Sequence, residues 1–275
     1  MKQIIGLILT LMTAKLFGQI LPKQINENDL SIGKSVTIES KVLGEQRNLN
    51  IYLPLSYSTD SLKSYPVIYL LDGSLDEDFI HITGIVQFGS FPWINMIPES
   101  IVVGIANVDR KRDFTYHPTS GYDKKDFPTS GKSKHFIQFI QKELQPFIDS
   151  TFRTKDNKTI IGQSLGGLLA TEILFKHPNL FDNYIIVSPS LWWDNENLLD
   201  YEPRTYITEK SIYIAVGKEG EVMEKTAKEL YAKLDKKKAD NTKLYFEFLE
   251  NKTHRDVLHI AVYNAFEKIF LAESK

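Results

Sequence analysis

The sequence predicts an α/β fold built on a mostly parallel central sheet with helices on both faces. Short apolar runs alternate along the chain with segments of helical period, as buried parallel strands alternate with crossover helices. The run Pro66–Leu71 has no polar alternation, so both of its faces must be covered. The chain has 275 residues, of which 42% are hydrophobic, and we expect residues 19–275 to form a single domain.

Two strands are expected to open this domain. Residues 35–40 and 47–53 alternate or are β-branched, and Gly44-Glu45-Gln46 separates them, so they are expected to pair as a hairpin. Further strands are expected at the apolar runs, over residues 66–71, 101–106, 159–161, 184–187, 212–217 and 244–249. Helices are expected within residues 79–90, over residues 133–148, between Ser164 and His177-Pro178, after Gly217 and over residues 256–272.

Residues 107–131 show no period and combine arginines, aromatic residues and prolines. A loop of this length inside a domain is usually functional or disordered, and its aromatic and charged side chains favour a substrate-facing loop. Arg110 is a candidate substrate-binding residue there. The commoner use of Arg110 and Arg112 is structural, as ion-pair partners of Asp109 or Asp113.

The segment Gly162-Gln163-Ser164-Leu165-Gly166 lies between an expected strand and an expected helix. Gly-x-Ser-x-Gly in this setting is typical of a nucleophile elbow, whose serine sits on a strained turn with flanking positions too close to neighbouring backbone for a Cβ. The serine also lies at a helix N-terminus, where the helix dipole favours developing negative charge. A chance glycine-rich turn is the alternative, and the flanking strand and helix disfavour it. Ser164 is therefore the candidate nucleophile.

A serine nucleophile needs a base, and the base needs an acid that orients it. In the α/β-hydrolase plan the acid and then the histidine follow the serine along the chain. His254 lies in the loop after the last expected strand and is preferred to His259, which is expected inside the final helix. The acid is expected after the strand that ends at Gly217, where Glu219 is favoured and Glu221 is the alternative. Either carboxylate could instead be a solvated helix start, and a Ser–His pair without a strong acid is a further possibility.

An oxyanion hole needs two backbone N–H groups aimed at the tetrahedral oxygen. One is expected from Leu165, the residue after the candidate nucleophile. The other is expected from Ser74, because Asp72-Gly73-Ser74 is the abrupt glycine turn after an early buried strand.

Together these motifs resemble the putative-esterase group of α/β-hydrolases, which includes siderophore esterases of the ferric-enterobactin type, S-formylglutathione hydrolases, feruloyl esterases and mycolyltransferases. The resemblance covers roughly residues 33–272 and depends on Val67–Gly73, Asn107-x-Asp109-Arg110-x-Arg112-Asp113, Glu143-Leu144-x-Pro146, Gly162–Gly167 and Ser188-Pro189-Ser190-Leu191-Trp192-Trp193. It implies serine-ester hydrolysis, a Leu-Leu-Asp-Gly-x oxyanion loop, and no metal or other cofactor. The Ser-Pro-Ser-x-Trp-Trp segment is most similar to the siderophore-esterase branch. Gln163 stands where relatives often have His and is expected to take no part in the chemistry.

Trp192, Trp193 and Tyr116 are candidate substrate-binding residues. One tryptophan is expected in the core, and the other is expected to form the wall of an acyl or aryl pocket. The sequence does not favour either assignment of the two.

The first residues are typical of a secretory signal peptide, expected over residues 1–18. Met1-Lys2-Gln3 is basic, residues 4–12 are apolar, and Gly18 supplies a small residue before Gln19. The apolar run is too short to span a bilayer, so no membrane span is expected in the mature chain. We expect a periplasmic or secreted protein, in which the absence of cysteine excludes disulfides and thiol chemistry.

The sequence therefore predicts an exported serine carboxylic-ester hydrolase that acts on a small-molecule ester, of siderophore type or with an aryl or acyl group. An acyltransferase at the same site, a peptidase on the same fold and a non-catalytic binding protein are the alternatives. The formal net charge of −2 and the scattered lysines give no reason to expect a nucleic-acid partner.

Overall fold

The computed structural model describes residues 21–271, and the predicted signal peptide over residues 1–18 lies outside this part of the chain. Residues 21–31 contain no helix or strand. The secondary structure described below belongs to the unit that begins at residue 32. No helix between residues 21 and 271 combines the length and the apolar character needed to cross a membrane.

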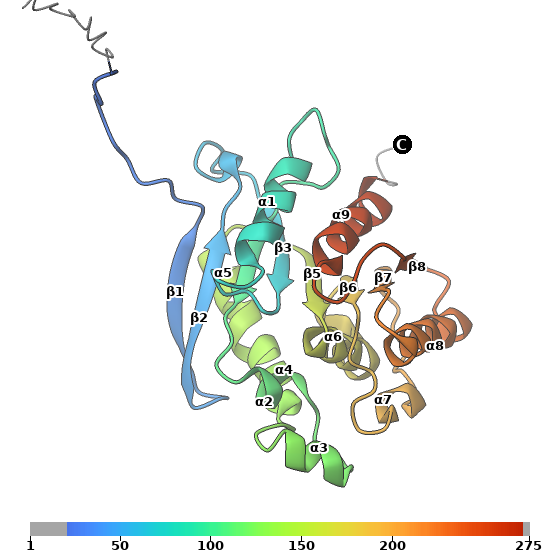
Figure 1. Ribbon diagram of the computed structural model, residues 1–275. Helices are drawn as coiled ribbons and strands as arrows, with labels where there is room; N and C mark the ends of the chain where they lie inside the picture. The colour runs from blue at the N-terminus through green and yellow to red at the C-terminus, as the bar shows by residue number, and fades with distance from the viewer. Residues whose placement is uncertain (1–20, 272–275) are drawn as a thin grey trace, which may run out of the picture. The chain divides into compact units, whose positions relative to one another are not determined.

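Within the described residues, eight strands form one sheet in the order β1-β2-β4-β3-β5-β6-β7-β8 (Figure 1). β2 pairs antiparallel with β1 and with β4, and every other neighbouring pair is parallel. The predicted hairpin and the predicted mostly parallel sheet are confirmed. The strands are β1 Lys34–Ser40, β2 Glu45–Tyr52, β3 Tyr65–Leu70, β4 Ile101–Ile105, β5 Thr154–Gln163, β6 Asn183–Val187, β7 Lys210–Gly217 and β8 Thr242–Leu249.

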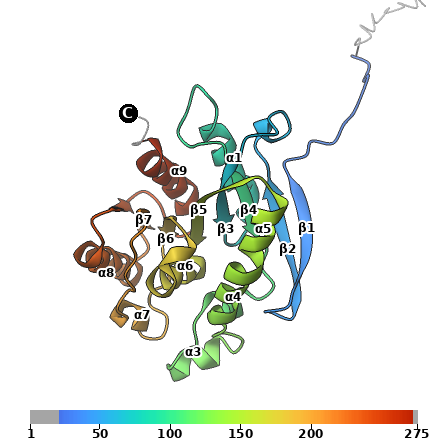
Figure 2. The same cartoon turned by 180° about the vertical axis from the view of Figure 1, so that it is seen from behind.

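Helices cover both faces of this sheet, as predicted. α1 and α9 lie on one face, and α4, α5, α6 and α8 lie on the other (Figures 1 and 2). The helices are α1 Phe79–Gly89, α2 Arg110–Phe114, α3 Gly121–Asp126, α4 Ser133–Phe139, α5 Gln145–Thr151, α6 Leu165–Lys176, α7 Asn197–Asp200, α8 Glu221–Lys237 and α9 Val257–Ile269. The single helix predicted over residues 133–148 is instead α4 and α5 joined by a π-helical turn, Ile140–Leu144. Pro146 follows this turn, and its missing N–H cannot continue a regular helical ladder.

The apolar strands are explained by burial on both faces. In β3, Val67 and Tyr69 pack into the core on the α6 side, whereas Ile68 and Leu70 pack into the core beneath α1 and α9. Side chains alternate between faces along a strand, so a strand between two helical layers must be apolar at every position.

The prediction of an irregular loop over residues 107–131 was wrong in part, because two short helices form there. The Asp109 side chain caps α2 by accepting from the Arg112 N–H at 3.0 Å. Ser120 caps α3 in the same way. Helices of five and six residues are too short to reveal a helical period in the sequence, although their capping residues are of the usual type.

A buried cluster of charges attaches α2 to β2. Arg47 Nη2 lies 2.5 Å from Asp113 Oδ2, and the two side chains are only 1% and 2% exposed. Arg47 also contacts Glu45 at 2.5 Å, and Arg112 contacts Glu45 and Asp113 at 2.5 and 2.8 Å. Two arginines therefore face two carboxylates, and the predicted ion pair between Arg112 and Asp113 is confirmed.

We expect Asp113→Asn to lower the free energy of unfolding by about 3 kcal/mol, because the Arg47 charge then stays buried with Glu45 as its one remaining counterion. Urea denaturation of the two proteins measures the difference. Glu209→Gln is the matched control, since its ion pair with Lys243 is exposed, and we expect a change below about 1 kcal/mol there. Equal losses in the two variants would contradict the role of burial.

Candidate active site

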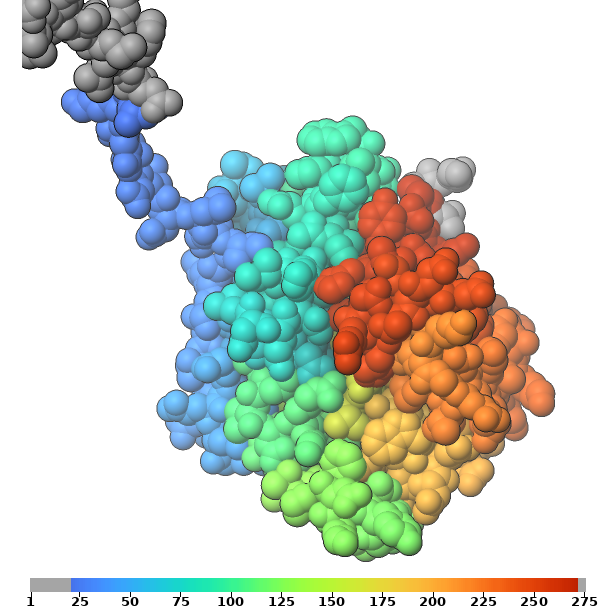
Figure 3. Space-filling view, viewed as in Figure 1, coloured from blue at the N-terminus to red at the C-terminus, as the bar shows by residue number. Residues whose placement is uncertain are grey.

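The three predicted triad residues lie at one edge of the sheet. Ser164 follows β5, Glu219 follows β7, and His254 lies in the loop after β8. Because these strands are parallel, their carboxyl ends meet at the same edge, where α/β proteins place their ligands. In the space-filling view the yellow segment that contains the elbow reaches the surface between the cyan segment after β3 and the red segment that leads into α9 (Figure 3).

Ser164 has the strained backbone expected of an elbow, with φ 59° and ψ −120°. Its N–H donates to Val187 O at 3.1 Å, which fixes the turn to β6. A Cβ on Gly162 would lie 2.4 Å from Gly166 O, so the crowding predicted at that glycine is present. At Gly166 the nearest atoms belong instead to side chains, with Asp72 Oδ2 at 3.3 Å, and the prediction of backbone crowding was wrong there.

Glu219 and His254 are in direct contact, with 2.5 Å between Oε2 and Nδ1. The Glu219 side chain is 2% exposed and that of His254 is 46% exposed. Glu219 Oε1 also accepts from Ser188 Oγ at 2.5 Å and from the Gly217 N–H at 3.0 Å. Burial by itself would raise the pKa of Glu219, but the hydrogen bonds from His254, Ser188 and Gly217 outweigh it and hold that pKa below its usual range. Glu221 is exposed in the first turn of α8.

This contact determines which nitrogen of His254 can act as a base. An ionised carboxylate only accepts hydrogen bonds, so Nδ1 carries the proton toward Glu219 and Nε2 keeps its lone pair. The other histidine considered for this role, His259, lies in α9 with its ring 4.6 Å from the ring of His81. Burial lowers the pKa of His259.

The hydroxyl of Ser164 lies 3.2 Å from Ser190 Oγ, and the Ser190 N–H donates to Ser164 O at 3.0 Å. Among the described residues, Ser164 Oγ forms no hydrogen bond with the His254 ring. In the absence of substrate, the hydrogen bonds of a catalytic site are often long or poorly aligned. The structure therefore joins the candidate acid to the candidate base and leaves the base–nucleophile contact open.

Ser188 and Ser190 have contacts at the site that sequence reasoning missed. Both follow β6, which lies between β5 and β7 in the sheet. Ser188 therefore reaches Glu219 on one side, and Ser190 reaches Ser164 on the other. The strand order could have indicated these contacts. Because β6 lies between β5 and β7, the residues that follow β6 must lie between Ser164, which follows β5, and Glu219, which follows β7.

The two predicted oxyanion-hole donors differ in their surroundings. Leu165 is the first residue of α6, so its N–H has no acceptor within the helix. The Ser74 N–H donates to Glu77 Oε2, and the N···O distance of 3.4 Å is long for a hydrogen bond. The preceding Gly73 N–H donates to Ile105 O at 3.0 Å, which holds the turn against β4.

The two tryptophans differ as expected in burial. Trp193 is fully buried and Trp192 is partly exposed. Trp193 Nε1 donates to Tyr116 O at 3.0 Å, and the Tyr116 hydroxyl donates to Trp193 O at 3.2 Å. Burial raises the pKa of Tyr116. These contacts give Trp193 and Tyr116 structural partners, and a substrate contact at Trp192 or Tyr116 stays a prediction.

The prediction that Arg110 pairs with Asp109 or Asp113 was wrong, because its partner is Asp72. Arg110 Nε and Nη2 lie 2.6 and 2.9 Å from the two oxygens of Asp72, and Nη2 donates to Gln163 O at 3.2 Å. Asp109 is occupied in capping α2, and Asp113 is enclosed in the buried charge cluster. Arg110 was also a candidate substrate ligand, and that role stays a prediction.

Gln163 contacts the loop of the candidate base, an arrangement that the sequence did not predict. Its Nε2 donates to the backbone carbonyl of His254 at 2.6 Å. The residue before the candidate nucleophile thus holds the backbone of the candidate base. A contact between residues 91 positions apart leaves no mark in the local sequence.

We expect Gln163→Met to lower kcat about 3- to 10-fold with little change in KM, because one neutral hydrogen bond of about 0.5–1.5 kcal/mol that positions His254 is lost. Gln163→His keeps a donor and should recover part of the loss. Gln145→Met removes an amide that donates to Leu180 O elsewhere in the fold, and we expect it to lower stability only. Wild-type kcat in Gln163→Met would show that the contact has no effect on turnover.

Two large cavities lie away from these residues. One of about 610 Å³ lies between α7 and α8, and one of about 550 Å³ lies near the start of β3 and the end of α1. Neither is lined by Ser164, Glu219 or His254. Over residues 21–271, no group of three or more His, Asp or Glu side chains is arranged to hold a metal ion.

Comparisons with known proteins identify the family and the fold. The family model described as Esterase, putative esterase, matches residues 40–270. Ferri-bacillibactin esterase BesA of Bacillus subtilis is 32% identical over 170 residues, which cover 56% of this chain and 58% of that protein. The chain thus matches little more than half the length of that relative.

Solved structures are similar over a larger share of this chain than the curated relative is. An IroE-like serine hydrolase from Shewanella oneidensis superposes with a TM-score of 0.78 at 30% identity and covers 87% of this chain and 80% of its own. The BES protein from Bacillus cereus gives a TM-score of 0.79 at 29% identity, over 90% of this chain and 98% of its own. The siderophore hydrolase EstA from Aspergillus nidulans is 20% identical with a TM-score of 0.74, over 92% of this chain and 100% of its own, and shows the shared fold.

Proposed function

The chain belongs to the putative esterase family, and from this membership we propose that it is a serine carboxylic-ester hydrolase with Ser164 as nucleophile. His254 is its base, Glu219 is its acid, and the N–H groups of Leu165 and Ser74 form its oxyanion hole. The observation that carries the proposal is the buried Glu219 carboxylate on Nδ1 of His254, at the sheet edge where Ser164 occupies a strained elbow.

The geometry supports the following sequence of steps. Ser164 Oγ attacks the ester carbonyl carbon while His254 Nε2 takes the hydroxyl proton, and the oxyanion accepts from Leu165 and Ser74. The tetrahedral intermediate collapses, the alcohol leaves with the proton from His254, and an acyl group stays on Ser164. Water then attacks this acyl-enzyme with His254 again as base, which releases the acid and restores the serine.

We propose an ester of siderophore type as the substrate class. The support is the description of relatives, a ferri-bacillibactin esterase at 32% identity and a siderophore enterobactin esterase of Emericella nidulans at 34% identity over 102 residues. The Ser188–Trp193 segment, which resembles that branch, also contacts both Ser164 and Glu219.

A panel of esters tests the proposal. p-Nitrophenyl acetate to octanoate, a feruloyl ester and a ferric catecholate trilactone are assayed with wild type and His254→Ala. We expect hydrolysis that His254→Ala reduces by several orders of magnitude, with the trilactone preferred. Transfer to an added alcohol that exceeds hydrolysis would instead identify an acyltransferase. No turnover, together with no labelling by a fluorophosphonate, would reject the proposed function.

We also propose that the protein is exported, on the basis of the signal-like residues 1–18. Expression of the full chain in a bacterial host, followed by N-terminal sequencing of the product in the periplasm and the medium, tests this. We expect a chain that begins at or near Gln19. A full-length product confined to the cytoplasm would contradict export and leave the esterase proposal unaffected.

A further inference from the structure

Arg110 connects the two turns that carry the proposed oxyanion-hole donors. Its guanidinium donates a hydrogen bond to each oxygen of the Asp72 carboxylate. Asp72 begins the Asp72-Gly73-Ser74 turn after β3. The same Nη2 donates to the carbonyl of Gln163, the residue before Ser164. One side chain therefore bridges the turn that contains Ser74 and the elbow that contains Leu165.

Both the backbone and the side chain of Asp72 are constrained by their surroundings. Its φ is 55°, an uncommon conformation for a residue other than glycine. It is buried, its Oδ1 also accepts from Asn107 Nδ2 at 2.7 Å, and its Oδ2 lies 3.3 Å from where a Cβ on Gly166 would be. The carboxylate thus packs against the first turn of α6, next to Leu165.

The charges around this carboxylate are mostly negative. Glu77 and Asp78 lie in the same loop, and burial together with the charges of Asp72 and Glu77 raises the pKa of Asp78 to about 6. A transition state that develops negative charge beside Ser74 and Leu165 would be repelled by a bare Asp72 carboxylate. Within residues 21–271, Arg110 is the cation in direct contact with the Asp72 carboxylate.

We propose that Arg110 is a positioning residue for the oxyanion hole, rather than a substrate ligand: it fixes the Ser74 turn against the elbow and neutralises Asp72. The inference rests on the proposed function, because it assigns a role within that hydrolytic site. The planar guanidinium donates to the two oxygens of Asp72 and to the Gln163 carbonyl in a fixed geometry that an ammonium group does not have.

Arg110→Gln, Arg110→Lys and the double variant Asp72→Asn/Arg110→Gln test the proposal. Complete loss of one oxyanion donor costs about 10²–10³ in kcat, so a displaced donor should cost about 10- to 100-fold in Arg110→Gln, with KM within about 3-fold of wild type. Arg110→Lys should fall between wild type and Arg110→Gln. The double variant should recover part of kcat, because Asn removes the charge and tolerates the positive φ.

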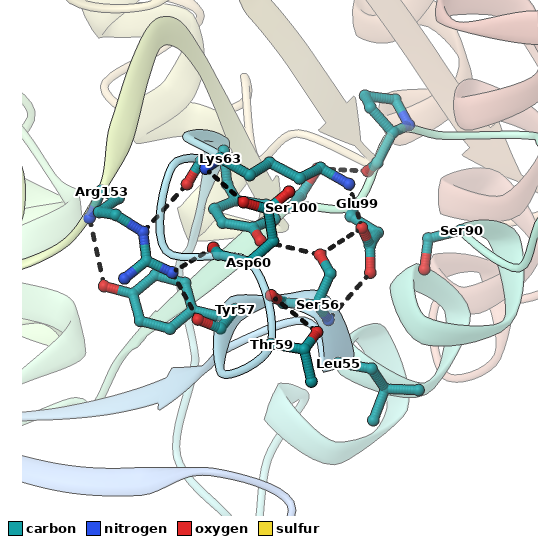
Figure 4. A network of polar contacts seen from close by, with 12 residues as sticks. Leu55, Ser56, Tyr57, Thr59, Asp60, Lys63, Ser90, Glu99, Ser100 and Arg153 are labelled. Carbon is teal, nitrogen blue, oxygen red and sulfur yellow. Dashed lines mark hydrogen bonds and ion pairs between the residues drawn. The ribbon is translucent and has the colours of Figure 1, made fainter.

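Arg153→Gln is the matched control. Arg153 also joins loops through its guanidinium, donating to the carbonyls of Tyr57, Asp60 and Lys63 at the amino-terminal ends of β3 and β5 (Figure 4). We expect it to lower the midpoint of thermal unfolding and to leave kcat unchanged.

Three outcomes would overturn the role of Arg110. They are wild-type kcat in Arg110→Gln, a rise in KM at constant kcat, and a double variant no better than the single one. Wild type is also labelled with a fluorophosphonate, whose tetrahedral adduct uses the same oxyanion hole, and the labelling rate of Arg110→Gln should fall with kcat. If wild type neither turns over nor reacts, the proposed function fails; if wild type reacts and Arg110→Gln matches it, the inference on Arg110 alone fails.

Discussion

Ser164→Ala is expected to lower kcat/KM for ester hydrolysis by about 10⁴- to 10⁶-fold, which is the usual cost of removing the nucleophile of a Ser–His–acid site. The reason is that no other group would remain to form the acyl-enzyme. Because the Ser164 hydroxyl contacts only Ser190 Oγ in the described structure, the substitution removes little that holds the fold together. We therefore expect an unchanged thermal midpoint.

The measurement is steady-state hydrolysis of the preferred ester by purified wild type and variant, beside mass spectrometry of the fluorophosphonate adduct. Ser150→Ala removes an exposed hydroxyl that contacts Phe147 O in α5, and it should leave activity unchanged. Activity that survives in Ser164→Ala would place the chemistry elsewhere on the molecule.

Glu219→Gln should lower kcat by about 10³- to 10⁴-fold with the fold intact. The amide oxygen of the variant can still accept from Ser188 and the Gly217 N–H, so its NH₂ group must face His254 Nδ1. An NH₂ group donates, which forces Nδ1 to accept and moves the ring proton to Nε2. His254 then has no lone pair for the Ser164 proton.

Glu221→Gln is the control for this variant, since that carboxylate is exposed in the first turn of α8. It should retain wild-type kcat. Comparable losses in both variants, or a loss in Glu221→Gln alone, would reject Glu219 as the acid.

Comparison of wild type with Glu219→Gln also tests the pH dependence of stability. The folded-state pKa of Glu219 lies below its ordinary value of 4.5, so its ionised form stabilises the fold above that pH. This contribution is lost as the pH falls through the lowered folded value. Wild type should therefore exceed Glu219→Gln in unfolding free energy at pH 7, and urea denaturation should show the gap narrowing below about pH 4.5. A gap that widens toward acid would contradict the lowered pKa.

Much of the fold could be predicted from the sequence, because a strand with helices on both faces has to be apolar throughout. β3 illustrates this, since Val67 and Ile68 point into different cores. Chain order then placed Ser164, Glu219 and His254 after parallel strands, where their loops meet. The choice between Glu219 and Glu221 could not be decided locally, because both follow β7. What separates them in the structure is the contact of Glu219 with His254 and Ser188, which come from other parts of the chain.

What the sequence could not predict depends on contacts between distant segments. Arg110 lies close to Asp109 and Asp113 along the chain, but its partner is 38 residues away. Gln163 donates to a carbonyl 91 residues away. Contacts of this kind are set by which turns the sheet brings together, and local sequence patterns carry no information about them.

β6 contributes none of the proposed reacting groups, yet it works as a spacer of fixed width. Neighbouring strands lie about 4.8 Å apart, so β5 and β7 are held about 9.6 Å from each other, too far for a serine hydroxyl to reach a carboxylate directly. An imidazole has the reach to span such a gap. Ser188 and Ser190 directly follow the last residue of β6, so a slip of that strand by one residue would displace both from their partners Glu219 and Ser164. The register of β6 is therefore as tightly constrained as that of β5 and β7, although β6 supplies no reacting group.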